Sequence, residues 1–302
     1  MSFDLYFYKK KGSAVSEKEI AAFLTSNGCV REGEFPQWFY ANDATGVYFS
    51  FEIQAESDDP EEITRFESFD EFDNTRFSFN INFIRPNFFA LEAFPIVERL
   101  MSKFDLSALD PQFDEDPDNP RKRTAEEYYQ EWSIPNLKLC SERFDQFGLL
   151  HFPMEKSNDY WRYNLSVREL QNKLGDDCFV PRLFLAKRVE TGEPITLSTW
   201  NQHIPTILPP ADFFAISREK KKLFRTIKES GVISGPKLLE TFEGYLGKYE
   251  VKDCHIISSE NSERVADAFN NVRFDYAFEG FSEPIDSQHL TNAERSPNQI
   301  SD

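Results

Sequence analysis

The sequence predicts an α+β protein of two domains, each a mainly antiparallel sheet with helices packed on it. Segments in which apolar and polar residues alternate with period two indicate half-buried strands. These segments stand beside others that carry helix-capping residues and apolar residues at helical spacing. The length of 302 residues suggests one large or two ordinary domains.

Residues 1–113 are expected to form the first domain, in the order β-α-β-β-β-α-β. Val47–Ile53 and Phe77–Phe83 show the clearest alternation, with mainly aromatic side chains on one face. This pattern favours a sheet that buries one face under helices. The predicted strands are Phe3–Tyr8, Trp38–Tyr40, Val47–Ile53, Phe77–Phe83 and Leu106–Leu109.

Two helices are expected in the first domain. Ser16 and Glu19 have the spacing of a capping box, which predicts a helix that ends at Asn27. The second helix is expected between Asn87 and Phe104, where apolar residues recur at helical spacing. Pro95 either kinks this helix or lies in its first turn.

Residues 114–124 are predicted to be a linker, because they are polar and contain two prolines. Asp114, Asp116 and Asp118 copy the first ligands of a calcium loop. Asn119 stands where that loop needs glycine, and Ala125 stands where it needs a bidentate glutamate. Neither a metal nor a cofactor is therefore expected.

Residues 125–281 are expected to form the second domain, and 282–302 a flexible tail that is poor in apolar residues. Thr124 and Glu127 repeat the capping-box spacing at the start of this domain. The predicted strands are 160–166, 182–189, 195–200 and 213–217, and the predicted helices are 167–174, 218–230, 236–242 and 262–269. The lysine-rich helix over 218–230 is interpreted as a solvated face rather than a site for RNA or phosphate.

The composition is strongly acidic, with 52 Asp and Glu against 34 Lys and Arg and a net charge of −18. Such a field repels nucleic acid and attracts a basic protein, although acidity for solubility alone gives the same composition. No apolar run approaches the ~20 residues of a membrane span, and the N-terminal sequence has the wrong order for a secretory signal. A cytoplasmic protein without nucleic-acid or membrane partners is expected. Its separated cysteines are typical of free thiols: Cys29, Cys140, Cys178 and Cys254.

No motif predicts catalysis, so the chain is not expected to be an enzyme. Cys254 and His255 are adjacent and would point to opposite faces of a strand. Ser217 and Lys220 have serine–lysine spacing, but Ser217 also fits a helix N-cap. A catalytic pair of carboxylates remains an open alternative, because among 52 acidic residues some pairs form by chance.

Glu56–Asp73 is the candidate partner-binding segment, with nine acidic residues and one arginine. Phe66, Phe69 and Phe72 recur every three residues and would form one apolar stripe on a helix. The stripe either docks on the domain's own sheet or anchors an acidic loop in the basic cleft of another protein. The expected contact residues are Asp58, Asp59, Glu61, Glu62, Phe66, Glu67, Phe69, Asp70, Glu71, Phe72 and Asp73.

Three passages carry a resemblance to a known family: residues 1–8, Phe83–Leu100 leading to Leu109–Gln112, and Ile207–Ile216. They resemble the cytoplasmic immunity proteins that bacteria encode beside secreted polymorphic toxins. The resemblance implies an α+β fold and tight stoichiometric inhibition of a toxin. The resemblance lies in the pattern of strands and helices and not in a catalytic motif. It therefore implies no catalytic residue in this sequence.

The leading hypothesis is an immunity protein that occludes the active site or substrate surface of a toxin. One alternative is a carboxylate-based hydrolase that reverses a toxin's modification, marked by a pocket of converging acids. Another is a small-molecule-binding regulatory module, marked by a closed apolar pocket. The toxin, the domain that binds it and the oligomeric state stay open.

Overall fold

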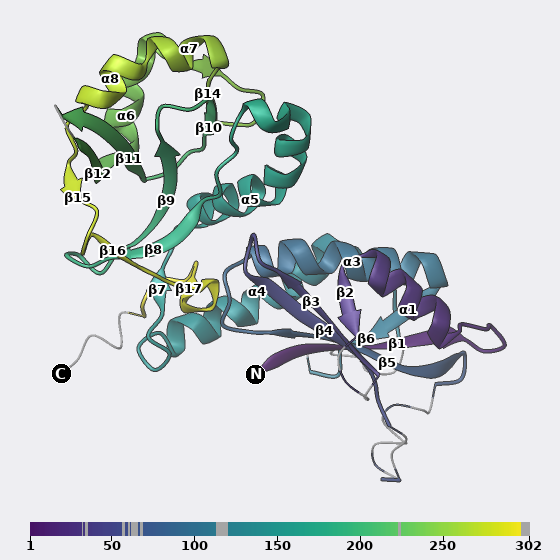
Figure 1. Cartoon of the computed structure of the whole chain (residues 1–302). Helices are drawn as coiled ribbons and strands as arrows, with labels where there is room; N and C mark the ends of the chain where they lie inside the picture. The colour runs from purple at the N-terminus through teal and green to yellow at the C-terminus, as the bar shows by residue number, and fades with distance from the viewer. Residues whose placement is uncertain are drawn as a thin grey trace. The chain divides into compact units, whose positions relative to one another are not determined.

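The chain is an α+β protein, as predicted (Figure 1). The computed structural model describes residues 1–31, 33, 36–55, 58, 59, 61, 66, 69–112, 120–222 and 225–296, without the side chains of 220–222 and 225. Residue contacts divide the chain into two compact units. Unit 1 comprises Met1–His151 with Gln288–Asp302, and unit 2 comprises Phe152–Ser287.

Unit 1 is built on an antiparallel sheet with the strand order β2-β3-β4-β5-β1-β6. The strands are β1 (Ser2–Lys10), β2 (Cys29–Arg31), β3 (Gln37–Asn42), β4 (Val47–Ile53), β5 (Phe72–Asn82) and β6 (Leu106–Leu109). The predicted strands of residues 1–113 are all present. The short strand β2 was not predicted, because three residues are too few to show an alternation.

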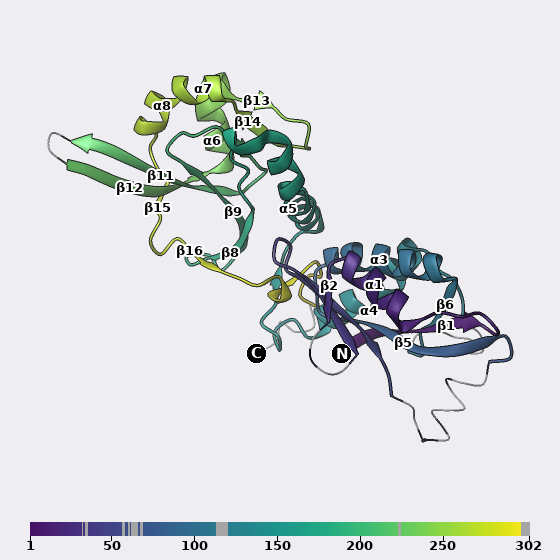
Figure 2. The same cartoon turned by 45° about the vertical axis from the view of Figure 1, so that its right-hand side comes forward.

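Helices α1 (Glu17–Ser26) and α3 (Phe88–Phe104) lie over the same face of this sheet (Figures 1 and 2). The capping box at Ser16 is present, and Pro95 lies inside α3. Phe94 of α3 contacts the rings of Phe3 and Phe79 at centroid distances of 5.7 and 5.9 Å. The phenylalanine-rich strand faces therefore form the core, as their period-two pattern predicts.

Glu92 is a buried carboxylate in α3, with 7% of its surface exposed. Tyr40 Oη and Asn42 Nδ2 donate to its Oε1 atom at 2.6 and 2.7 Å, and Thr45 Oγ1 donates to Oε2 at 2.9 Å. These bonds compensate the desolvation of the charge and tie the β3–β4 hairpin to α3.

Helix α4 (Ala125–Glu142) belongs to unit 1, so the predicted border at 114–124 differs from the observed division. The cause is ring packing. Tyr128 contacts Phe94 at 5.6 Å and Trp132 contacts Phe83 at 6.3 Å. The predicted capping box at Thr124 opens α4, and residues 113–119 lie outside the described residues.

The chain returns to unit 1 after residue 287, where a flexible tail was predicted. Strand β17 (Leu290–Thr291) pairs in parallel with β7 (Leu150–His151), and Asn292 Oδ1 accepts a hydrogen bond from the backbone N of Asn87 at 2.7 Å. Earlier in the same stretch, β16 (Ser282–Pro284) pairs with β8 (Phe184–Arg188) of unit 2. Residues 282–284 and 290–291 are thus held by strand pairing rather than loose.

Unit 2 contains a sheet with the strand order β15-β12-β11-β9-β8-β16, in which only β9 and β11 pair in parallel. Its strands are β8 (Phe184–Arg188), β9 (Pro194–Asn201), β11 (Phe213–Lys222), β12 (Arg225–Ser234), β15 (Tyr276–Ala277) and β16. A second sheet joins β10 (Thr206–Leu208), β14 (His255–Ile257) and β13 (Gly247–Lys248). The helices are α5 (Met154–Leu174), α6 (Gly235–Phe242), α7 (Ser259–Arg264) and α8 (Ala266–Asn271).

The strand predicted over 160–166 is wrong, because these residues lie in helix α5. The helix predicted over 167–174 is the C-terminal part of the same helix. Tyr160, Tyr163 and Leu170 are buried along one helical face. Tyr163 Oη donates to the carbonyl of Pro181 at 2.7 Å, and Asn164 Nδ2 donates to that of Leu183 at 3.0 Å. The buried rings thus follow a spacing of three to four rather than two.

The predicted helix over 218–230 is instead the hairpin of β11 and β12, which extends from the body of unit 2 (Figure 2). Arg218 lies opposite Glu229 and pairs with it at 3.0 Å. The Arg218 guanidinium also donates to the carbonyls of Phe269 and Val272. These bonds to the α8 end fix the base of the hairpin.

No helix within the described ranges is both long and apolar enough to cross a membrane.

Glu92→Leu is expected to lower the free energy of unfolding by about 3 kcal/mol, because three hydrogen-bond donors lose their buried acceptor. Urea denaturation followed by circular dichroism measures this loss. Glu98→Leu on the same helix is the control and should change stability by less than about 0.5 kcal/mol. Equal losses in the two variants would contradict a structural role for the Glu92 carboxylate.

Candidate partner-binding surface

The three phenylalanine rings of the candidate segment, Phe66, Phe69 and Phe72, lie on the face of the unit 1 sheet that α1 and α3 leave open. In β1, Phe3, Leu5 and Phe7 are buried in the core beneath the helices. Tyr6 and Tyr8 belong to the opposite face by the alternation of the strand. Their neighbours in space are Phe66, Phe69, Phe72 and Leu109.

The aromatic stripe docks on this open face. Phe66 contacts Tyr6 at a centroid distance of 4.7 Å, and Phe69 contacts Tyr8 edge-on at 5.1 Å. The hydroxyl of Tyr8 donates to the backbone carbonyl of Phe66 at 3.0 Å. Phe69 is 7% exposed, so its ring is engaged within unit 1 and is not available to anchor a partner. The rings thus pack on the unit's own sheet, as the first of the two interpretations has it, but Phe72 is itself the first residue of strand β5, so the three rings do not form one helical stripe.

The exposed carboxylates of the segment form a group that we call the acidic rim, defined as Asp58, Asp59, Glu61, Asp70 and Glu71. Asp59 Oδ1 accepts a hydrogen bond from the backbone N of Glu61 at 2.9 Å. The carbonyl of Glu71 accepts one from the backbone N of Lys11 at 3.0 Å. Both bonds fix the backbone that carries these carboxylates.

Three further acids of the expected contact set, Glu62, Glu67 and Asp73, are not counted in the acidic rim. Asp73 lies opposite Lys9 in the pairing of β5 with β1, and its carboxylate forms an ion pair with Lys9 Nζ at 2.9 Å. Its charge is therefore compensated within the chain. Glu62 and Glu67 lie outside the described residues.

Sequence reasoning missed the residues that hold the segment in place: Tyr6, Tyr8 and Lys9. The alternation of β1 contains a signal for the tyrosines, since they occupy the positions between the phenylalanines. Lys9 follows no such pattern, because its partner Asp73 is far away in the sequence.

The four cysteines are poor candidates for nucleophiles. All are buried, and burial raises the pKa of Cys29 and Cys254 to about 12 from an ordinary value of 9.0. Burial also raises the pKa of Cys140 and Cys178. Because the thiolate is the reactive form, these side chains stay protonated and unreactive near neutral pH.

Two of the four histidines, His151 and His203, bond to backbone carbonyls within their own units. A ring nitrogen lies 3.1 Å from the Ala293 carbonyl in His151 and 3.0 Å from the Ser262 carbonyl in His203. Ser217 lies within β11 and is no helix N-cap, which corrects the expectation. Within the described part of the chain, no three His, Cys, Asp or Glu side chains group as metal ligands would.

Phe69→Ala is expected to lower the free energy of unfolding by about 3 kcal/mol, because a buried aromatic contact is lost. Chemical denaturation followed by fluorescence measures the change. Phe147→Ala is the matched control, since Phe147 belongs to unit 1 and is 46% exposed. A Phe69→Ala protein as stable as the control would show that the ring does not hold the segment on the sheet.

The buried thiol of Cys29 predicts a loss of stability in alkali. Its pKa is raised in the folded state, so the unfolded chain releases this proton first, and the free energy of unfolding should fall from pH 9 towards 12. Urea titrations at pH 8, 9.5 and 11 should show a smaller fall for Cys29→Ala than for the unaltered protein. Val30→Ala removes an exposed neighbour as the control, and an identical fall in both variants would contradict the assignment.

No protein-family model matches the chain, and neither a curated protein nor a solved structure matches it. The acidic rim and its aromatic support therefore provide the basis for a functional proposal.

Proposed function

We propose that the chain is a cytoplasmic immunity protein that binds a toxin domain with a basic cleft and blocks it sterically. The observation that supports this proposal is the acidic rim, in which five exposed carboxylates belong to the same stretch of chain as the rings of Phe66 and Phe69, which dock on the unit's own sheet. The contact set is reduced to Asp58, Asp59, Glu61, Asp70 and Glu71. The rings of the segment pack on the sheet, Asp73 pairs with Lys9, and Glu62 and Glu67 lie outside the described residues.

The docked rings favour affinity because they reduce the conformational freedom that the segment would lose when a partner binds. A free loop loses conformational freedom when a partner immobilises it, and this loss weakens binding. Phe66 and Phe69 already fix the middle of the segment against Tyr6 and Tyr8. A partner would therefore meet carboxylates whose backbone is in part held beforehand.

The charge of the chain favours a basic partner. Attraction between complementary surfaces speeds encounter and selects among partners more than it raises affinity. Toxins that act on nucleic acids or nucleotides need basic clefts for phosphate groups, and a row of carboxylates can occupy such a cleft in place of phosphates. The net charge of −18 supplies the long-range part of the attraction, and the acidic rim supplies the local part.

The test replaces all five residues of the acidic rim by lysine and uses, as partner, the protein encoded immediately upstream of this chain, which the proposal requires to contain a toxin domain. Association should slow by roughly 10- to 100-fold at low salt, because the steering field reverses at the contact. Surface plasmon resonance at two salt concentrations measures the rate, and growth during co-expression measures protection.

The matched control changes five exposed acids of unit 2 to lysine: Glu240, Glu243, Glu260, Glu263 and Asp267. It alters the net charge equally, so a slower rate for the acidic-rim variant alone supports the proposed surface. Equal rates in the two variants would assign the attraction to the overall charge. Loss of protection from a single acid substitution with the complex intact would instead favour the hydrolase alternative.

A further inference from the structure

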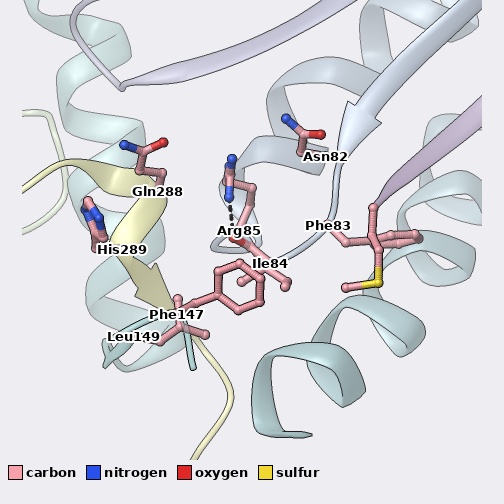
Figure 3. A pocket seen from close by; sticks show the side chains of 9 residues that line it. Asn82, Phe83, Ile84, Arg85, Phe147, Leu149, Gln288 and His289 are labelled. Atoms are coloured by element: carbon pink, nitrogen blue, oxygen red, sulfur yellow. Dashed lines mark hydrogen bonds between the residues drawn. The ribbon is translucent and has the colours of Figure 1, made fainter. Parts of the chain in front are cut away.

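Unit 1 also contains a pocket of about 320 Å³ where the chain passes from β5 to α3 (Figure 3). Asn82 and Arg85 come from this passage, Phe147 and Leu149 from the segment after α4, and Gln288 and His289 from the returning chain. None of its lining residues, all of them described, is acidic. In a chain of net charge −18, this pocket is a local exception.

Arg85 presents a partly used guanidinium in this pocket. Its Nε and Nη2 atoms donate to the hydroxyl of Tyr48, and Nη1 donates to the carbonyl of Ile84 at 2.7 Å. A guanidinium has five N–H groups, and these bonds use one on each nitrogen. One N–H on Nη1 and one on Nη2 are left, and two N–H groups on neighbouring nitrogens can bind the two oxygens of a carboxylate or phosphate.

The charge of Arg85 has no carboxylate partner among the described residues. Its guanidinium instead lies over the rings of Tyr48 and Phe89, at 5.3 and 5.9 Å from their centroids. Cation–π contacts of this kind orient a guanidinium without neutralising it. The cation is therefore held in place and remains able to attract an anion.

The backbone beside Arg85 is held in a strained conformation. Ile84 has φ of +62°, a region that a β-branched residue rarely adopts. Asn136 of α4, 2% exposed, accepts hydrogen bonds from the backbone N of Ile84 and of Arg85 at 2.7 and 3.2 Å and donates to the Arg85 carbonyl at 2.9 Å. Strain maintained by a buried clamp is typical of functional positions.

We propose that this pocket binds a small organic anion, with its carboxylate or phosphate head on Arg85 and its apolar body against Phe147 and Leu149. Phe147 is 46% exposed, whereas Leu149 is 4% exposed. The ring and the aliphatic side chain therefore offer an apolar wall beside the cation. This site is independent of the acidic rim, and it gives a specific form to the small-molecule alternative.

The test titrates the full-length protein with benzoate, phenyl phosphate, inorganic phosphate and neutral benzamide, followed by ¹H–¹⁵N NMR. Benzoate or phenyl phosphate should shift the Arg85 side-chain signal and the amides of Ile84 and Leu149, and the two probes distinguish a carboxylate from a phosphate head. Benzamide should shift none of them. Binding of inorganic phosphate as tight as that of phenyl phosphate would overturn the apolar part of the proposal, and benzamide binding equal to benzoate would overturn the role of charge.

Two variants test the residues. Arg85→Lys keeps a charge but loses the two-pronged geometry and should raise the dissociation constant at least about tenfold. Phe147→Glu places a negative charge on an exposed side chain at the pocket and should do the same by repulsion, whereas Phe147→Gln should have a smaller effect. Arg85→Lys also loses the hydrogen bonds to Tyr48. If this variant fails to fold, the comparison of Phe147→Glu with Phe147→Gln tests the proposal instead. Unchanged affinity in Phe147→Glu, or no shifts with any anion, would overturn the proposal.

Discussion

The helices α1 and α3 cover only one face of the unit 1 sheet, and this constraint governs the rest of the unit. The other face carries Tyr6 and Tyr8, whose rings need cover as well. The segment between β4 and β5 supplies that cover through Phe66 and Phe69. Because Phe66 and Phe69 are used for docking, the described charged side chains that this segment exposes to water are the acids Asp58, Asp59, Glu61, Asp70 and Glu71. One stretch of chain thus closes the sheet and creates a charged surface.

The sequence was most informative where burial and period coincide. Val47–Ile53 and Phe77–Phe83 each place large rings on one face, so strand and core could be predicted together. The capping boxes at Ser16 and Thr124 are equally local, because donor and acceptor lie three residues apart. The acids of the candidate surface were visible for the same reason, as a run of like charge.

Prediction failed where structure depends on distant partners. The lysine-rich run over 218–230 has helical spacing, but its charges also match across a hairpin, with Arg218 opposite Glu229 and Glu219 opposite Lys228. Only pairing separates the two structures. The docking of Phe69 on Tyr8 and the Arg85 pocket join segments far apart in the chain, and no local pattern contains that information.

The return of β17 to β7 makes unit 2 an insertion within unit 1. On the ribosome, unit 1 would therefore lack the β17–β7 strand pair until the whole of unit 2 had been translated. A nascent chain halted after His151 and before Gln288 could fold the main sheet of unit 1. It could not form the hydrogen bond between Asn87 and Asn292. Synthesis of the inserted unit thus sets the moment at which the first unit can reach its final form.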